Sequence, residues 1–255
     1  MRGLSRDGAV RPGNACRSAP SRHPSLPRAR LLPRPRFRAA RAPLSGGNTL
    51  SVNDDRTTAA TAAPASPAAD PAPLGLAAFA LTTFLLSAAN AGWMTKASGD
   101  AWLGYAFAYG GLCQLLAGMW EFKNRNVFGA TAFSTYGGFW IGLGLWAKLV
   151  APTITSPSVA GHDLGWILLA FAIFNTYMLL CSTAVNGAVF GVFLTLEITE
   201  IILFLGNFAG NSGTIKFGGY VGVLTALVAW YTSAAGVMNG LRGRAVIPVG
   251  SPFIK

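Results

Sequence analysis

Long apolar stretches separated by short polar segments make up the sequence from Leu74 onward. An α-helix rises about 1.5 Å per residue, so about 20 apolar residues cross the roughly 30 Å of hydrocarbon in a bilayer. Six stretches of about this length follow one another, and each predicts a transmembrane helix: residues 75–94, 101–120, 128–150, 164–182, 184–206 and 218–239.

Residues 164–206 form one nearly unbroken apolar run. As a single helix this run would be about 65 Å long, twice the thickness of a bilayer, so the chain has to turn back within it. Small and polar residues predict the turn either at Ser182 and Thr183 or at Asn186 and Gly187.

The composition agrees with this pattern. Apolar residues make up 52% of the chain and charged residues 11%, whereas soluble domains carry roughly 25% charged residues. The sequence therefore predicts an all-α integral membrane protein, with a six-helix domain over residues 70–250 and a short C-terminal tail over 251–255. Glycine pairs four residues apart predict closely packed helices, with a widened solute path as the alternative: Gly138/Gly142, Gly187/Gly191, Gly218/Gly222 and Gly236/Gly240.

Residues 1–69 are rich in Arg, Pro, Ala and Ser, and residues 1–70 hold 12 of the 20 basic side chains. Such a segment buries too little apolar surface to offset its ordering entropy, so it is predicted to be disordered. It resembles an organelle transit peptide, but its many prolines equally fit a solvated tail or sequence upstream of the true start. Because no Trp or Tyr precedes Trp93, the basic residues do not indicate a nucleic-acid-binding face.

Basic residues in the connecting segments favour one orientation in the membrane, because Lys and Arg are enriched on the cytoplasmic side. The side of the N-terminus carries Arg56, Lys123, Arg125, Arg242, Arg244 and Lys255, and the opposite side carries Lys96, Lys148 and Lys216. Both termini are therefore predicted to lie in the cytoplasm or an equivalent compartment.

The sequence contains no recognisable catalytic or metal-binding pattern. Its three cysteines are far apart and odd in number, and it has only two histidines, so neither a zinc site nor a disulfide framework is indicated. A P-loop, a dinucleotide-binding glycine motif and a catalytic triad are also absent from the sequence. We expect neither an enzyme nor a bound metal or cofactor.

Two glutamates, Glu197 and Glu200, lie deep within the fifth predicted span. Ionisable side chains in a membrane are costly, and they usually face the interior of a bundle or a water-filled path. Each glutamate could take up a proton along a solute path, or its carboxyl could join two helices by hydrogen bonds. The same two readings apply to the neutral polar residues of the spans: Thr82, Thr83, Ser87, Asn90, Gln114, Ser134, Thr135, Tyr136, Asn175, Thr176 and Tyr177.

The first span begins at a distinctive segment, DPAPLG, formed by Asp70, Pro71, Ala72, Pro73, Leu74 and Gly75. Two prolines predict an extended entry into a helix, and Asp70 can cap its first turn. Continued to residue 86, the segment resembles the NPAPLG signature of the acetate uptake transporter family, which includes the bacterial succinate–acetate permeases and their fungal relatives. Residues 109–140, 206–222 and 244–250 also resemble this family, so the similarity covers about residues 70–250.

The resemblance implies a six-helix subunit with a solute path through each protomer, assembled in the membrane as a homo-hexamer. It implies a constriction formed by Phe79, Tyr136 and Leu196, and it makes Ala229 a position that influences substrate choice. Asp70 replaces the usual Asn of the signature, and both glutamates stand where the family is expected to be neutral. Because Glu200 follows Leu196 by one helical turn, it is our first candidate for a proton site, with Glu197 as the second.

The predicted function is transport of acetate and other small monocarboxylates, with succinate as a further substrate and a proton as the coupled ion. The alternative is a channel for small neutral solutes such as ammonia or urea. A structural or signalling membrane protein without transport activity is the third reading. The plasma membrane is the predicted location, and an organelle membrane follows if residues 1–69 act as a transit peptide.

Overall fold

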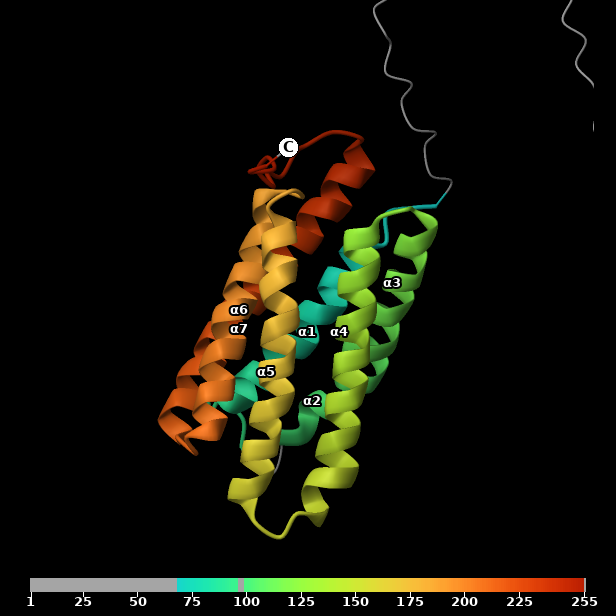
Figure 1. The fold of residues 1–255 in the computed structure, drawn as a ribbon. Helices are drawn as coiled ribbons and strands as arrows, with labels where there is room; N and C mark the ends of the chain where they lie inside the picture. Colours follow the sequence, from blue (N-terminus) through green and yellow to red (C-terminus); the bar gives the residue numbers. More distant parts are fainter. Residues whose placement is uncertain (1–67, 96–98, 255) are drawn as a thin grey trace, which may run out of the picture. The chain divides into compact units, whose positions relative to one another are not determined.

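A computed structural model describes residues 68–95 and 99–254 (Figure 1). The predicted tail therefore lies almost wholly outside the described residues. All regular secondary structure in the described ranges is helical, as the sequence predicts for an integral membrane protein.

Four helices are each long and apolar enough to cross a membrane: α1 (Ala72–Asn90), α5 (Pro157–Ser182), α6 (Gly187–Phe208) and α7 (Ser212–Arg242). The two remaining predicted spans are helical too, but each contains a stretch of π-helix. The second span comprises η1 (Gly99–Ala101), α2 (Trp102–Phe107), the π-helix η2 (Ala108–Cys113) and α3 (Gln114–Lys123). The third comprises α4 (Val127–Leu145), the π-helix η3 (Trp146–Val150) and the short η4 (Ala151–Thr153).

Asparagine side chains begin three of these helices. The side-chain oxygens of Asn126, Asn186 and Asn211 accept hydrogen bonds from the third residue of α4, α6 and α7 respectively, which is a favourable N-cap arrangement. Because α5 ends at Ser182 and α6 begins after Asn186, the predicted turn within the long apolar run is confirmed.

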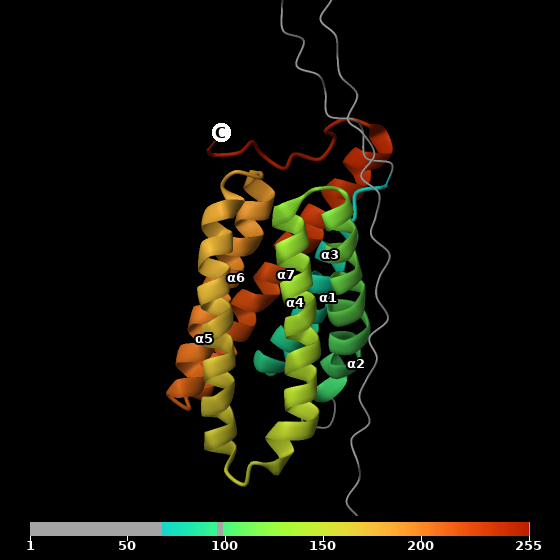
Figure 2. The same cartoon turned by 45° about the vertical axis from the view of Figure 1, so that its right-hand side comes forward.

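The helices pack in neighbouring pairs. In Figure 2, α5 and α6 lie on one side and α3 and α4 on the other, with α1 and α7 behind them. Helices α1, α4 and α6 begin at the same end of the bundle. The Asn124 side chain before α4 donates to the carbonyl of Ala69 before α1, and Asp70 and Asn186 line one cavity. These three helices therefore run parallel, which matters for the site below.

The predicted glycine contacts are only partly correct. Gly218 and Gly222 pack against Leu203 and Ser87. Gly138, Gly142 and Gly240, however, have open space where a side chain would project, so within this chain their predicted role in helix packing is wrong. In α4 other glycines make close contacts, among them Gly137, which lies against the backbone of the second span.

Candidate functional site

Phe79, Tyr136 and Leu196 come together in the interior, one from each of the parallel helices α1, α4 and α6. Each is buried, with 4%, 3% and 6% of its surface exposed respectively. The rings of Phe79 and Tyr136 meet edge to face, 5.7 Å apart. All three residues line two cavities, so they separate one from the other. We call these three residues the constriction.

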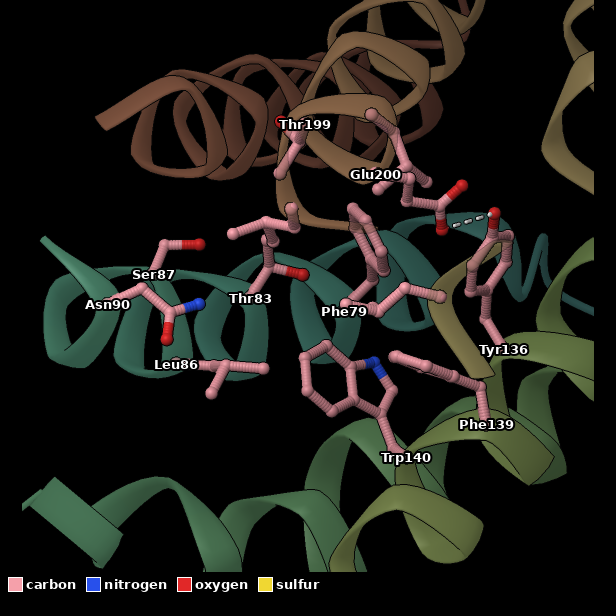
Figure 3. Close-up of a pocket in the computed structure, with 13 residues that line it drawn as sticks. Phe79, Thr83, Leu86, Ser87, Asn90, Tyr136, Phe139, Trp140, Thr199 and Glu200 are labelled. Carbon is pink, nitrogen blue, oxygen red and sulfur yellow. Dashed lines mark hydrogen bonds between the residues drawn. The ribbon is translucent and has the colours of Figure 1, made fainter. Parts of the chain in front are cut away.

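The larger of these two cavities, the central cavity, measures about 40 Å³ (Figure 3). A buried water needs roughly 10–15 Å³ by this measure, so the cavity has room for about three waters or one small molecule. The smaller cavity measures about 20 Å³. Besides the constriction, the central cavity is lined by Thr83, Leu86, Ser87, Asn90, Phe139, Trp140, Leu168, Thr199, Glu200 and Leu203.

Three polar groups that line the central cavity contain a buried atom without a hydrogen-bond partner among the described residues. These atoms are the hydroxyl oxygen of Thr83, the indole nitrogen Nε1 of Trp140 and Oε2 of Glu200. Buried polar groups in native proteins nearly always find a partner, so three orphans around one cavity call for an explanation such as water or a ligand.

The three residues with unpartnered atoms each lie four residues after a residue of the constriction. Thr83, Trp140 and Glu200 follow Phe79, Tyr136 and Leu196 by four residues, which is about one helical turn on nearly the same face. Because the three helices run parallel, all three polar side chains lie on the same side of the constriction, away from the helix N-termini. We call Thr83, Trp140 and Glu200 the polar ring.

The constriction and the polar ring are joined by one hydrogen bond. The Tyr136 hydroxyl lies 3.3 Å from Oε1 of Glu200 (Figure 3). It also lies 3.0 Å from Oδ1 of Asn175 on α5. Glu200 is therefore at the predicted place next to Leu196 and faces the central cavity.

Two further cavities adjoin the central cavity and the smaller cavity, one on each side of the constriction. Beyond the polar ring, a cavity of about 100 Å³ shares Leu86, Asn90, Leu168 and Leu203 with the central cavity. On the other side of the constriction, Leu76 lines both the small cavity and one of about 160 Å³. The latter lies at the start of α1, where Asp70, Ala72 and Pro73 line it. The predicted entrance signature thus lies at one end of this row of cavities.

The entrance residues also start helix α1. Oδ1 of Asp70 accepts a hydrogen bond from the amide of Ala72, the first residue of α1, 2.9 Å away. Pro71, the N-cap residue, has a helical backbone with φ −82° and ψ −12°, so the predicted extended entry is wrong. The helix begins at Ala72 with a proline in its first turn. Asp70 is exposed, whereas Gly75 packs tightly against the ring of Phe133.

The remaining candidates lie elsewhere. Ala229 on α7 is fully buried in the hydrophobic core and lines none of the cavities along this row. Glu197 points to the boundary between α5 and α6, where it accepts hydrogen bonds from Asn175 and Thr176. Sequence reasoning gave no role to Trp140 and left Thr83 among many polar residues. The shared spacing of four residues from the constriction was the signal that could have found both.

Comparison with known proteins identifies the family. A model of the GPR1/FUN34/yaaH family matches residues 54–251. The chain belongs to this family. Over 196 residues it is 41% identical to "Acetate permease A" of Emericella nidulans, a match that covers 71% of this chain and 65% of that protein. It is 36% identical over 183 residues to "Succinate-acetate/proton symporter SatP" of Escherichia coli, covering 71% of this chain and 95% of the relative.

The fold agrees with that of a solved family member. The "Structure of the bacterial acetate channel SatP" superposes with a TM-score of 0.67 at 34% identity, over 72% of this chain and 99% of the other. The chain is thus an integral membrane protein of a family that contains transporters and channels. The match spans just under two thirds of the length of the Emericella permease and of two yeast relatives.

Proposed function

We propose that this GPR1/FUN34/yaaH family protein transports acetate and other small monocarboxylates, together with a proton, along a path through each protomer. Relatives named as an acetate permease, a succinate-acetate/proton symporter and an acetate channel support the substrate class. The observation that carries the mechanism is the polar ring, with three unpartnered polar atoms one turn from an apolar constriction.

Recognition of the substrate falls to Trp140 and Thr83. The indole N–H and the threonine hydroxyl both donate hydrogen bonds, and a carboxylate offers two acceptor oxygens. Hydrogen bonds to a charged group are stronger than neutral ones, and buried donors without partners are costly. An acetate in the central cavity therefore satisfies two orphaned donors at once, while its methyl group meets Leu168 or Leu203.

Proton transfer falls to Glu200. A bare anion crossing the side chains of Phe79 and Leu196 would lose its hydration without replacement, which is strongly unfavourable. If Glu200 holds a proton and passes it to the bound carboxylate, the solute crosses the constriction as the neutral acid. Glu200 is then left ionised and takes the next proton from the same side.

The orientation predicted from the basic residues fits this order of events. With both termini in the cytoplasm, α1, α4 and α6 begin on the cytoplasmic side, and the polar ring lies on the outer side of the constriction. Acetate entering from outside then meets the proton donor before the apolar barrier. An inward proton gradient at the plasma membrane would drive its accumulation.

The proposal extends to assembly as a homo-hexamer in lipid. Large apolar side chains are exposed on the outer surface of several helices, including Trp166 on α5 and Leu116 on α3. In a membrane such surfaces contact lipid or neighbouring subunits. Mass measurement of the detergent-solubilised full chain, with a hexamer as the expected species, tests this part.

The direct test is uptake of labelled acetate by proteoliposomes that contain the full chain, measured above protein-free liposomes. We expect accumulation that depends on an inward proton gradient. Trp140→Phe should raise the KM for acetate roughly tenfold or more, because it removes one charge-assisted hydrogen bond. Trp166→Phe, on the exposed surface of α5, is the matched control and should leave the KM unchanged.

Glu200→Gln separates coupling from conduction. This change preserves the size of the side chain but removes its proton chemistry, so we expect acetate to equilibrate without accumulating. Asp163→Asn, at an exposed carboxyl, should behave like the unmodified chain. Unchanged accumulation in Glu200→Gln would refute the proton site. Passage of urea or ammonia without any effect of the proton gradient would favour the alternative channel.

A further inference from the structure

A chain of polar side chains leads from the central cavity into the boundary between α5 and α6. Asn175 is fully buried and stands at its centre. Its Oδ1 lies 3.0 Å from the Tyr136 hydroxyl, and its Nδ2 lies 2.7 Å from Oε2 of Glu197. Beyond Glu197, the hydroxyl of Thr176 lies 2.8 Å from the other carboxylate oxygen, Oε1.

The orientation of the Asn175 amide follows from a backbone group. Nδ2 lies 3.0 Å from the carbonyl oxygen of Phe193. A carbonyl only accepts, so the NH2 group of the amide has to face it. The opposite atom, Oδ1, therefore faces Tyr136 as an acceptor. The two amide hydrogens are both used, one on Phe193 and one on Glu197.

Tyr136 has one hydroxyl proton but two acceptors within reach, Asn175 and Glu200. If Glu200 is ionised, the hydroxyl is drawn to it, and Oδ1 of Asn175 loses its donor. If Glu200 is protonated, it can donate to the Tyr136 oxygen while Tyr136 donates to Asn175. Only in this second arrangement does each of these side-chain groups have a hydrogen-bond partner. The exception is Oε2 of Glu200, which faces the cavity.

We propose that Asn175, with Glu197 behind it, is a positioning residue that directs the Tyr136 hydroxyl away from Glu200 and thereby keeps Glu200 protonated until a substrate arrives. The inference rests on the proposed role of Glu200 as the proton site. Asn175 supplies the competing acceptor. Glu197 accepts hydrogen bonds from Asn175 and Thr176 and adds a second carboxyl near Glu200. Two carboxylates in one site oppose each other's ionisation.

The neighbouring titratable groups are few. Among the described residues around Tyr136, α6 contributes Glu197 and Glu200, and α5 contributes Tyr177. Tyr177 is half exposed. Among these groups, only the two glutamates carry a carboxyl.

Infrared titration of the full chain in lipid tests the proposal without any transport measurement. The C=O stretch of a protonated carboxyl that is present in the unmodified chain and absent in Glu200→Gln reports Glu200 directly. We expect Asn175→Leu to move the midpoint of this band to lower pH by roughly one unit, because Tyr136 can then donate only to Glu200 and favours its ionised form.

Glu197→Gln provides a second variant that preserves size. Its amide oxygen can still accept from Asn175, and its NH2 group can donate to the Thr176 hydroxyl, which then donates to the carbonyl of Ala172. This variant should also lower the midpoint, because it removes a negative charge close to Glu200. Thr195→Val is the matched control on α6, because the Thr195 hydroxyl donates to carbonyls of its own helix. In this variant the midpoint of the Glu200 band should equal that of the unmodified protein. Thermal unfolding of each variant confirms that it is folded.

The outcomes separate this inference from the proposed function. Midpoints that stay unchanged in both Glu197→Gln and a folded Asn175→Leu would overturn the positioning role, whether or not acetate is transported. Absence of any carboxyl band assignable to Glu200 would overturn it as well. Lack of gradient-driven uptake by the unmodified protein would instead overturn the proposed function. The infrared titration would then still test whether Asn175 and Glu197 affect the protonation of Glu200.

Discussion

Adjacent glycines on α4, Gly137 and Gly138, should respond in opposite ways to the same substitution by alanine. A Cβ on Gly137 would lie 2.7 Å from the backbone nitrogen of Leu115 and 2.9 Å from the carbonyl oxygen of Gly111. Ordinary contacts begin near 3.5 Å, and neither partner is a side chain that can rotate away. On Gly138 the same Cβ would meet nothing within 4 Å.

The two changes share one favourable term and differ in strain. Alanine is favoured over glycine in a helix by about 1 kcal/mol at either position. At Gly137 the second and third spans would have to separate by roughly 0.6–0.8 Å, and overpacking of this kind costs about 3 kcal/mol at the upper end of its usual range. We therefore expect Gly137→Ala to destabilise the fold by about 2 kcal/mol and Gly138→Ala to leave it unchanged or slightly more stable.

Thermal unfolding of the full chain in detergent, followed by Trp fluorescence, distinguishes the two variants. A loss of 2 kcal/mol corresponds to a Tm about 4–8 °C lower in a chain of this size. Gly137 adjoins Tyr136, so the same displacement should also change the distances from the Tyr136 hydroxyl to its partners on α5 and α6, now 3.0 and 3.3 Å, and thereby weaken acetate uptake. Equal Tm values for the two variants would refute the backbone contact on which this reasoning depends.

Two further predictions concern contacts of α7. Asn239 accepts hydrogen bonds from the amides of Val246 and Ile247 and donates one to the carbonyl of Ile247. Asn239→Ala should therefore increase hydrogen exchange and proteolysis in residues 244–254. Unchanged protection of this segment would show that these hydrogen bonds do not hold it in place. The hydroxyls of Thr199 and Thr225 lie 3.0 Å apart between α6 and α7. A double-mutant cycle with Thr→Val at both positions should give a coupling in the free energy of unfolding of about 0.6–1 kcal/mol. A coupling of zero would show that this hydrogen bond adds no stability.

The sequence was sufficient for the helical architecture, because bilayer thickness converts apolar length directly into spans. Five of the six predicted spans overlap a single long α-helix, and the turn between α5 and α6 falls at the predicted residues. The second span was predicted as one helix, but a π-helical stretch over Ala108–Cys113 interrupts it. Backbone hydrogen bonds shift there without any change in hydropathy, so the pattern contained no signal for it.

The rotation of each helix about its axis was harder to predict, and the glycines show why. A span that is apolar all round has no amphipathic face that points to the interior. Gly137 and Gly138 are therefore equivalent by pattern, although one packs against backbone and the other faces outward. The constriction was located through family resemblance, and Glu200 through its spacing from Leu196. Asn175 stayed undecided because its partners, Tyr136 and Glu197, come from two other helices.

The separation of the polar ring from the constriction by one helical turn has a physical consequence. The one polar group of the constriction, the Tyr136 hydroxyl, already has partners in Asn175 and Glu200. A free polar group there would bind the carboxylate at the narrowest point, and the desolvated anion would then have to leave against that attraction. Under the proposed function, polar groups placed one turn away hold the anion where the cavity has room for water, and they allow it to be neutralised before it meets Phe79 and Leu196. On this proposal the constriction has to discriminate only by size and charge, and Thr83 and Trp140 select for the carboxylate group. Under this arrangement, enlarging the constriction should broaden the range of acids without changing the preference for carboxylates.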